Sequence, residues 1–344
     1  MEQTRGKMAK FKIHRIDSGT YREEVFSLWE RYLPGTPRGR LDWLEQNPHG
    51  KAIWYGAFLE GAERLVGTLT VMPRKIETGK QSFKAGIMGD LMVEKEFQVF
   101  GPTLSLMRTA IQEYRASGFD FLYTFPNRAS EKFSFRAGFQ EVESTARFVR
   151  ILNLENALKK YIPGKAAGLL AGGSNFLWNL PRRENYIRPQ TAIVEWNKPA
   201  DLPPLVLRAE GRDWIGLSGG DSKYVEWKYR QNPLFRFDFL QCEGGEPRCI
   251  LGHIVFSQRG GIVHIFDLAA REENFKTVLA SLLRHLRKKG MQSVSMRAFR
   301  KGPLTEIFKK FGFLEREEKV PFLLSGDKKF MDMNWLFFEG ARNI

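Results

Sequence analysis

The two halves of this 344-residue chain carry the same series of motifs, and this internal repeat constrains the fold more than any other feature. Each half has a Trp, then Asn-Pro, a strand-like run, a Gly-rich turn and a second strand-like run. The copies read LDWLEQNPHGKAIWYGAFLEGAERLVGTLTVMP and VEWKYRQNPLFRFDFLQCEGGEPRCILGHIVF. Further on, GDLMV around Asp90 corresponds to FDLAA around Asp267. The repeat predicts two units of similar fold.

Each half reads as a meander of antiparallel strands followed by a strand, helix, strand, helix unit. The helix after Asp90 has apolar residues at spacings of three and four, namely Leu104, Met107, Ile111 and Tyr114. We therefore predict an α/β (α+β) fold with two lobes, each a mixed, mostly antiparallel sheet flanked by helices. The expected boundaries are 1–150 for the first lobe, 151–205 for a linker and 206–344 for the second lobe.

The expected linker contains an apolar centre, residues 166–180, that is too short to cross a bilayer. Lys and Arg residues flank it on both sides. A linker helix packed on the lobes is the favoured interpretation, and a peripheral membrane contact is the alternative. The formal net charge of +15 favours an anionic partner, such as a phosphorylated cofactor, an anionic polymer or a lipid surface. No zinc-finger, RNP-type or basic-zipper motif is present.

The N-terminus, MEQTRGKMAKFKIHRID, has no apolar run of the kind found in signal peptides, so we expect a cytoplasmic protein. In a reducing compartment Cys242 and Cys249 are expected to be free, buried thiols rather than a disulfide. Two Cys without clustered His also argue against a structural zinc site.

A difference in length between the halves points to an anion site in the first half alone. Asp90 precedes Gly118 by 28 residues, whereas Asp267 precedes Gly290 by 23. The extra residues fall in VEKEFQVFGPTLSL, where Gly101 precedes an expected helix whose first amides can bind a phosphate. Gly101-Pro102 could also be a plain helix start. The second half reads REENFKTVL there, which is acidic and should repel a diphosphate.

Two segments of the first half resemble the GNAT acyltransferase superfamily. That family has a Gln/Arg-x-x-Gly-x-Gly/Ala loop after a strand ending in Val, and LMVEKEFQVFGPT supplies Val93, Gln98, Gly101 and, at the last position, Thr103. The family also has an Asn followed about eleven residues later by Gly-Phe, and FLYTFPNRASEKFSFRAGF provides Asn127 at that spacing. The likeness covers about residues 11–150, with a degenerate second copy over about 206–325.

The resemblance implies binding of an acyl-CoA, most simply acetyl-CoA, and an amine acceptor that the sequence does not identify. It implies a backbone amide on the Leu91–Val93 strand as the donor to the developing oxyanion. The second copy has Lys301 where the first has Asn127 and lacks the loop, so no second cofactor site is expected. The implied cofactor-binding residues are Leu91, Met92, Val93, Gln98, Val99, Phe100, Gly101, Thr103, Leu104, Asn127 and Phe133.

Departures from the family pattern bear on catalysis. Pro102 lacks the N–H that relatives direct at the pyrophosphate. Ser134 stands where many relatives have a Tyr that protonates the leaving thiolate. Asp90 is the candidate base, with a structural capping role as the alternative. Tyr123 is the nearest hydroxyl for the acid, unless it is a core aromatic residue.

The sequence thus predicts an N-acyltransferase that transfers the acyl group by direct attack of the amine. Two alternatives remain open. One is a non-catalytic GNAT-like protein that binds an anionic glycan, lipid or nucleic acid, and the other is a tRNA-dependent aminoacyl transferase.

Overall fold

The structure is a computed structural model, and it describes residues 10–78, 81–98, 101–153, 187, 191–195, 206–209, 211–217, 221–245, 247 and 249–342. Val99 and Phe100, both expected to bind the cofactor, lie outside the described residues. So do the apolar stretch 166–180 and its basic flanks, where a membrane contact was considered.

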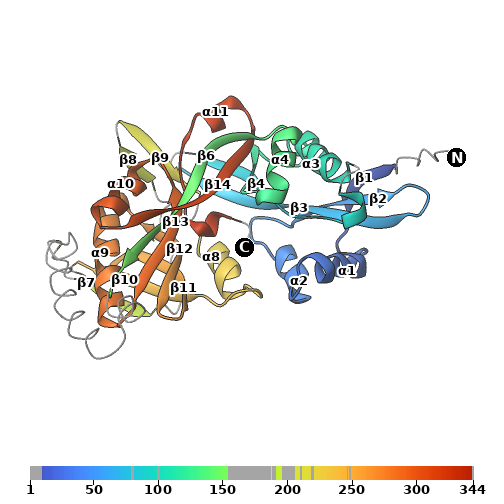
Figure 1. Cartoon of the computed structure of the whole chain (residues 1–344). Helices are drawn as coiled ribbons and strands as arrows, with labels where there is room; N and C mark the ends of the chain where they lie inside the picture. Colours follow the sequence, from blue (N-terminus) through green and yellow to red (C-terminus); the bar gives the residue numbers. More distant parts are fainter. Residues whose placement is uncertain are drawn as a thin grey trace.

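One twelve-stranded sheet runs through both halves of the molecule (Figure 1). Its strands pair in the order β1-β2-β3-β4-β5-β14-β6-β13-β12-β11-β10-β7. Within this sheet, only the β4–β5 and β12–β13 pairs are parallel among the described strands. The strands are β1 (Phe11–Ile16), β2 (Ile53–Leu59), β3 (Arg64–Glu77), β4 (Ser82–Val93), β5 (Phe121–Thr124), β6 (Gln140–Ile151), β7 (Thr191–Glu195), β10 (Asp238–Gly244), β11 (Cys249–Arg259), β12 (Ile262–Ala270), β13 (Ser293–Phe299) and β14 (Leu314–Gly326). A smaller sheet joins β15 (Asn334–Leu336), β9 (Arg212–Gly216) and β8 (Val206–Ala209).

Helices cover both faces of the large sheet, which agrees with the continuous burial of strands such as β2, β3 and β5. In the first half, α3 (Pro102–Glu113) and α4 (Arg128–Ala137) lie on one face, and α1 (Arg22–Tyr32) and α2 (Gly39–Glu45) lie on the other (Figure 1). The remaining helices are η1 (Lys95–Phe97), α8 (Ser222–Val225), η2 (Glu226–Arg230), α9 (Glu272–Lys288), α10 (Pro303–Lys310), α11 (Lys328–Met331) and η3 (Glu339–Ala341). The predicted fold class, a mixed and mostly antiparallel sheet flanked by helices, is confirmed.

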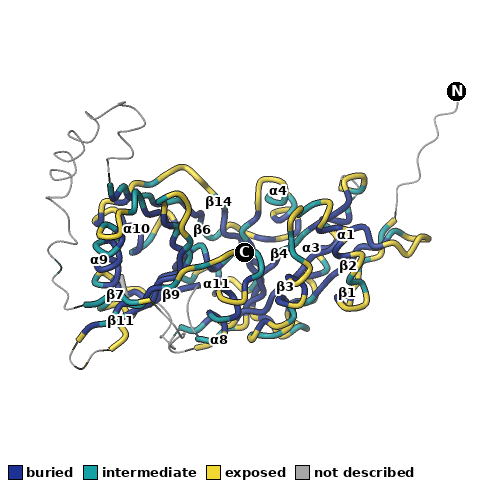
Figure 2. The backbone as a smooth tube through the Cα atoms, turned by 90° about the horizontal axis from the view of Figure 1, so that it is seen from below, coloured by how far each residue is buried: buried dark blue, intermediate teal, exposed yellow. Residues whose placement is uncertain are grey.

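The amphipathic pattern explains why α3 forms where it does. Pro102 occupies its first turn, where a missing N–H costs nothing, and Leu106, Met107 and Ala110 are buried against the sheet. In Figure 2 the dark blue, buried backbone follows the strands through both halves, while loops and outer helix faces are exposed.

The two halves exchange a strand at the centre of the sheet. β6, the last strand of the first half, pairs with β13 through Ser293–Phe299, and β14 pairs with β5 through Leu323–Gly326. β14 and β6 also pair with each other. Each half therefore completes its sheet with a strand from the other, which the sequence did not predict.

The repeated Trp residues meet where the halves pack together. The rings of Trp43 and Trp227 stack with centroids 4.5 Å apart. The indole N–H of Trp43 donates to the Trp227 carbonyl at 2.8 Å, and that of Trp227 donates to the Trp43 carbonyl at 2.6 Å. Such a reciprocal contact is what a two-fold relation between similar units produces.

The two Asn-Pro motifs shape equivalent turns beside this contact. Oδ1 of Asn47 accepts the amide of His49, and Oδ1 of Asn232 accepts the amides of Leu234 and Phe235. In the first turn, Nε2 of His49 lies 2.9 Å from a carboxylate oxygen of Asp221 in the other half. The motif thus builds the contact between halves and fixes the loop that carries Leu234 and Phe235.

Both Cys residues are free, but only Cys242 is buried and Cys249 is exposed, so the expectation of two buried thiols is wrong for Cys249. In the part of the chain that the structure describes, no helix combines the length and apolarity that crossing a membrane requires.

Candidate active site

A bulge in β4 and a short β5 open the sheet at its centre. Thr68 pairs with Met92 and Thr70 with Gly89, so Asp90 and Leu91 are opposite a single residue of β3. Asp90 has φ of 46°, a left-handed conformation that Asp tolerates better than most residues. The parallel pairing of β4 with β5 extends only from Ala85 to Ile87, after which the strands diverge.

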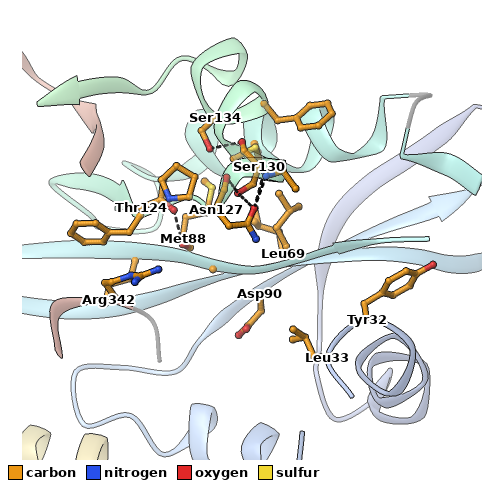
Figure 3. A pocket seen from close by; sticks show the side chains of 18 of the residues that line it. Tyr32, Leu33, Leu69, Met88, Asp90, Thr124, Asn127, Ser130, Ser134 and Arg342 are labelled. Carbon is orange, nitrogen blue, oxygen red and sulfur yellow. Dashed lines mark hydrogen bonds between the residues drawn. The ribbon is translucent and has the colours of Figure 1, made fainter. Parts of the chain in front are cut away.

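A cavity of about 870 Å³ lies at this opening. Elements of the first half form most of its wall, including the ends of β4 and β5, the start of α3 and one face of α4. In Figure 3, Asn127, Ser130 and Ser134 lie on the side of α4, whereas Asp90, Leu33 and Tyr32 lie on the opposite side of the strands. The volume is within the range of small-molecule sites, near its upper end. The cavity therefore passes through the sheet.

The start of α3 is suited to bind an anion beside this cavity. Gly101 precedes the helix with φ of 102°, and a Cβ built there would meet no atom within 4 Å, so the space is open. Thr103 and Gln98 line the cavity, and Nε2 of Gln98 donates to the Val93 carbonyl at 3.0 Å, which fixes the loop. Pro102 has no amide, so the free donors of the first turn begin at Thr103.

The start of α4 differs, because its amides are already occupied. Oδ1 of Asn127 accepts the amides of Ala129 and Ser130, both at 3.0 Å. Asn127 and Phe133 line the cavity, and their predicted role in cofactor binding stays a prediction. Of the two helix ends at the opening, α3 is therefore the one that can bind a phosphate.

Asp90 lines the cavity and is held by an arginine. One carboxylate oxygen accepts from Nη2 of Arg40 at 2.7 Å, and the other accepts from Oγ1 of Thr70 at 3.3 Å. The side chains of Arg40 and Asp90 are only 7% and 5% exposed. Arg40 also lies over the ring of Trp29, 5.5 Å from its centroid. The candidate base is thus a buried, ion-paired carboxylate.

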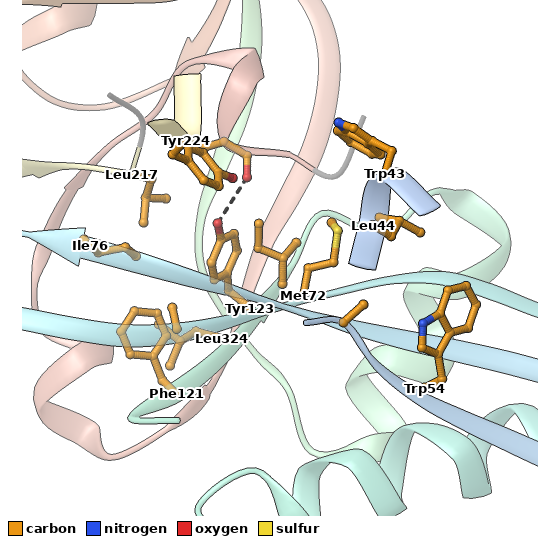
Figure 4. Close-up of a cluster of buried hydrophobic side chains, with 14 of the residues drawn as sticks. Trp43, Leu44, Trp54, Met72, Ile76, Phe121, Tyr123, Leu217, Tyr224 and Leu324 are labelled. Carbon is orange, nitrogen blue, oxygen red and sulfur yellow. Dashed lines mark hydrogen bonds between the residues drawn. The ribbon is translucent and has the colours of Figure 1, made fainter. Parts of the chain in front are cut away.

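Tyr123, the candidate acid, lies in the core on another side of β5. It is fully buried, burial raises its pKa, and its hydroxyl donates to the Ala341 carbonyl at 3.2 Å (dashed in Figure 4). Ser134 lines the cavity, but its hydroxyl donates to the Ser130 carbonyl within α4. Tyr123 therefore has no part in the chemistry proposed below, and Ser134 does not replace the missing Tyr.

The other residues expected to bind the cofactor divide into two groups. Leu91 and Val93 line the cavity with Gln98, Thr103, Asn127 and Phe133. Met92 is buried in the core on the other face of β4, and Leu104 packs against the core under α3, so neither lines it. This division follows from the alternation of side chains along a strand and around a helix.

Sequence reasoning missed the residues that come from distant segments. Tyr32 at the end of α1, Leu33 directly after it and Arg40 in the first turn of α2 line the cavity. A second set comes from the other half of the chain: Leu234, Phe235, Phe266, Glu339 and Arg342. Only the repeated Asn-Pro motif, which fixes the loop of Leu234 and Phe235, gave a signal for any of them.

The segment Phe338–Arg342 is anchored at several points, and we call it the clasp. Tyr123 binds the carbonyl of Ala341, and Nζ of Lys228 donates to the carbonyl of Arg342 at 2.9 Å. A Cβ at Gly340 would collide with the Tyr229 hydroxyl and lie 2.9 Å from the Phe266 carbonyl. The backbone therefore approaches its neighbours as closely as only glycine allows.

Lys228 is buried, with 3% of its surface exposed, and burial lowers its pKa well below the ordinary value of 10.5. In the unfolded chain its ammonium titrates near 10.5, so across the window between the two pKa values only the unfolded state binds this proton. Stability must then rise with pH through that window. We expect the free energy of unfolding of the native protein, minus that of Lys228→Met, to increase as the pH approaches 10.5, measured by urea denaturation. Parallel pH profiles would contradict this.

In the second half, the start of α9 carries Glu272 and Glu273 in its first turn, directly after Arg271. The expectation that no second cofactor site lies here stays a prediction. A diphosphate is disfavoured there, since anions at a helix start need free amides and no competing carboxylates.

Comparison with known proteins shows which family model and which solved structures this chain is similar to. Residues 13–142 match the model of the acetyltransferase (GNAT) domain. A probable N-acyltransferase from Enterococcus faecalis superposes with a TM-score of 0.64 at 10% identity, over 92% of this chain and 72% of that chain. A GCN5-related N-acetyltransferase from Anabaena variabilis gives 0.61, also at 10% identity and over 92% and 72% of the chains.

Yeast N-myristoyltransferase, solved with bound myristoyl-CoA and inhibitors, gives a TM-score of 0.51 at 12% identity, over 94% of this chain and 82% of that chain. No curated protein sequence matches the chain. At these identities the solved structures show a shared fold, while the family model identifies the segment that contains the cavity. Residues 13–142 of this chain therefore resemble the GNAT acetyltransferase domain, and the chain shares the fold of these solved structures.

Proposed function

We propose that the protein transfers an acyl group from a coenzyme A thioester, most simply acetyl-CoA, to an amine acceptor. The observation that carries the proposal is the cavity between the diverging ends of β4 and β5, with the open start of α3 at its edge. This arrangement offers an anion site and an apolar cleft beside unpaired strand backbone. A diphosphate followed by a long, thin thioester arm has the charge and the shape to occupy both.

The residues present fit such a ligand. The amides from Thr103 onward, with the helix dipole, would bind the diphosphate, and the open space around the Cβ position of Gly101 admits it. Phe133 and Leu91 give an apolar lining to the cleft. The acyl-CoA supplies the thioester when bound, and a backbone amide of the Leu91–Val93 segment would donate to the oxygen of its carbonyl group.

Asp90 would receive the proton that the amine loses. The amine nitrogen forms a bond to the acyl carbon, the carbon–sulfur bond breaks, and the sulfur leaves as the coenzyme A thiol once it gains a proton. With Tyr123 committed to the clasp and Ser134 to α4, that proton comes from solvent. Arg40 holds the Asp90 carboxylate at the bulge, where it faces the cavity.

We further infer that residues 206–344 are a degenerate counterpart of the first lobe. The order strand, strand, strand, helix, strand, helix, strand occurs in both halves, and the exchange of β6 and β14 and the reciprocal Trp contact support the relation. The second lobe would complete the sheet of the first lobe with β14 and form part of the cavity wall.

The test combines ligand binding and turnover. The protein is heated with acetyl-CoA and with longer acyl-CoAs, and thiol release is then followed with a panel of amines. A ligand at 100 times its dissociation constant adds about 2.7 kcal/mol of apparent stability, so binding is readily seen. Stabilisation together with amine-dependent thiol release supports the proposal. Stabilisation without release on any amine would instead favour a non-catalytic binding protein, and no stabilisation by any thioester would remove the proposal.

A further inference from the structure

Four charged side chains line the cavity within the described part of the chain, and they differ in what their hydrogen-bonding groups already contact. Arg40 and Asp90 form one buried pair. Glu339 uses both of its carboxylate oxygens, one with Nε of Arg297 at 2.7 Å and one with Nη1 of Arg342 at 2.8 Å. Arg342 is the remaining member of the set.

Arg342 keeps donors available for a ligand. A guanidinium has five N–H groups in a planar fork, and in the described structure Arg342 directs Nη1 to Glu339. Its side chain is 27% exposed at the cavity, so the other nitrogens can reach a bound molecule. Glu339 cannot neutralise it fully, because Arg297, which also contacts Glu318 at 2.6 Å, shares the same carboxylate.

The backbone at Arg342 is held by buried polar groups, and burying such groups lowers stability. The amino group of Lys228 donates to the Arg342 carbonyl, and the hydroxyl of Tyr123, from the other half, donates to the Ala341 carbonyl. Gly340 lets the segment pass against Tyr229. A packing role alone would need no buried amino group, since an apolar side chain of similar size would fill the same space. The clasp is thus built to hold Arg342 at one place on the cavity wall.

We propose that Arg342 binds an oxyanion of the acceptor, so that the preferred acceptors are amines that also carry a carboxylate or a phosphate. This inference rests on the proposed acyl transfer and names its substrate class. The amine lies toward Asp90 and the oxyanion toward Arg342, which Figure 3 shows displaced from Asp90 along the strands, away from Tyr32. Leu234, Phe235 and Phe266 add apolar lining to the cavity and, like Arg342, come from the second half.

The experiment compares matched amines on the full chain with saturating acetyl-CoA. One arm uses glycine, β-alanine and 4-aminobutyrate against their carboxamides, and the other uses O-phosphoethanolamine against ethanolamine. We expect kcat/KM to be at least about 10-fold higher for the anionic member of the better arm, because a hydrogen bond to a charged group is worth about that factor. The arm with the larger ratio tells whether the oxyanion is a carboxylate or a phosphate.

Variants separate recognition from folding. Arg342→Gln should raise KM for the preferred anionic amine about 10-fold or more and remove the preference, with acetyl-CoA still stabilising the protein. Arg342→Lys should keep part of the preference for anionic amines, because lysine retains the positive charge but lacks the planar guanidinium. Arg300→Gln is the matched control, because Arg300 pairs with Glu315 on the exposed surface and does not line the cavity.

A positioning role of the clasp is tested with Lys228→Met. We expect KM for the anionic amine to rise several-fold, whereas KM for the matched neutral amine should not rise and the melting temperature should not fall. A general loss of structure would instead raise both KM values and lower the melting temperature. Equal kcat/KM for anionic and neutral amines, with turnover intact, would overturn the inference but leave acyl transfer standing. If nothing turns over, binding of the anionic amines alone is compared between the native protein and Arg342→Gln, and equal or absent binding also overturns it.

Discussion

Replacement of Gly101 by glutamate is expected to abolish the stabilisation that acyl-CoA gives the protein, a loss of about 2.7 kcal/mol at a ligand concentration 100 times the native dissociation constant. Gly101 immediately precedes α3, and a side chain built on it points into open space. A carboxylate there would occupy the amides and the dipole that otherwise attract the diphosphate. Thermal unfolding with and without acetyl-CoA measures the effect.

Gly101→Ala is the matched control for this change. At φ of 102° any L side chain is strained, so both variants lose stability, on the order of 1 kcal/mol or more, without ligand. Alanine adds no charge, and its acyl-CoA shift should persist. The difference between the two variants isolates the electrostatic effect. A shift in Gly101→Glu equal to that of Gly101→Ala would show that the diphosphate does not bind at α3.

Asp90→Asn is expected to lower kcat by about 100-fold or more, because a positioned base typically contributes a factor of 10² to 10⁴. Asparagine is a suitable replacement, as it also tolerates the left-handed backbone at φ of 46°. Single-turnover thiol release at saturating acetyl-CoA and amine measures the chemical step.

The same substitution leaves Arg40 buried without its partner, and breaking such a pair costs about 3–5 kcal/mol. Two further variants separate this structural cost from the chemistry. Arg40→Met should destabilise the protein yet retain the carboxylate. The double variant Arg40→Met with Asp90→Asn should regain stability while kcat stays low. Recovery of kcat in the double variant would show that Asp90 acts only by holding Arg40.

The sequence predicted those parts of the fold that depend on local pattern. The spacing of apolar residues predicted α3, and the two Gly-rich segments predicted the hairpins whose turns contain Gly61 and Gly245, both with positive φ. The repeat predicted that a second series of strands and helices follows the first. The exchange of β6 and β14 was not predictable, because pairing between strands so distant in sequence leaves no local signal.

The sequence pointed to the site residues that belong to the family motifs, and it did not point to those that lie outside them. Gln98, Thr103, Asn127 and Phe133, which the resemblance implies as cofactor-binding residues, all line the cavity, and the binding itself stays a prediction. Tyr123 was misleading because β5 is buried on both faces, so the alternation of polar and apolar residues that reveals a strand's orientation is missing. Arg40 and Arg342 reach the cavity through tertiary packing alone, and neither belongs to a pattern that marks it.

The exchange of β6 and β14 between the halves affects the order in which the sheet can form. β14 inserts between β5 and β6, so the sheet beside the cavity cannot close until that late strand has been synthesised and has found its place. Contacts over such long separations form slowly, and a nascent chain without them exposes the unpaired edges of β5 and β6. The cavity is therefore among the last features of the sheet to form, and truncation within β14 should leave an aggregation-prone product rather than a folded first half.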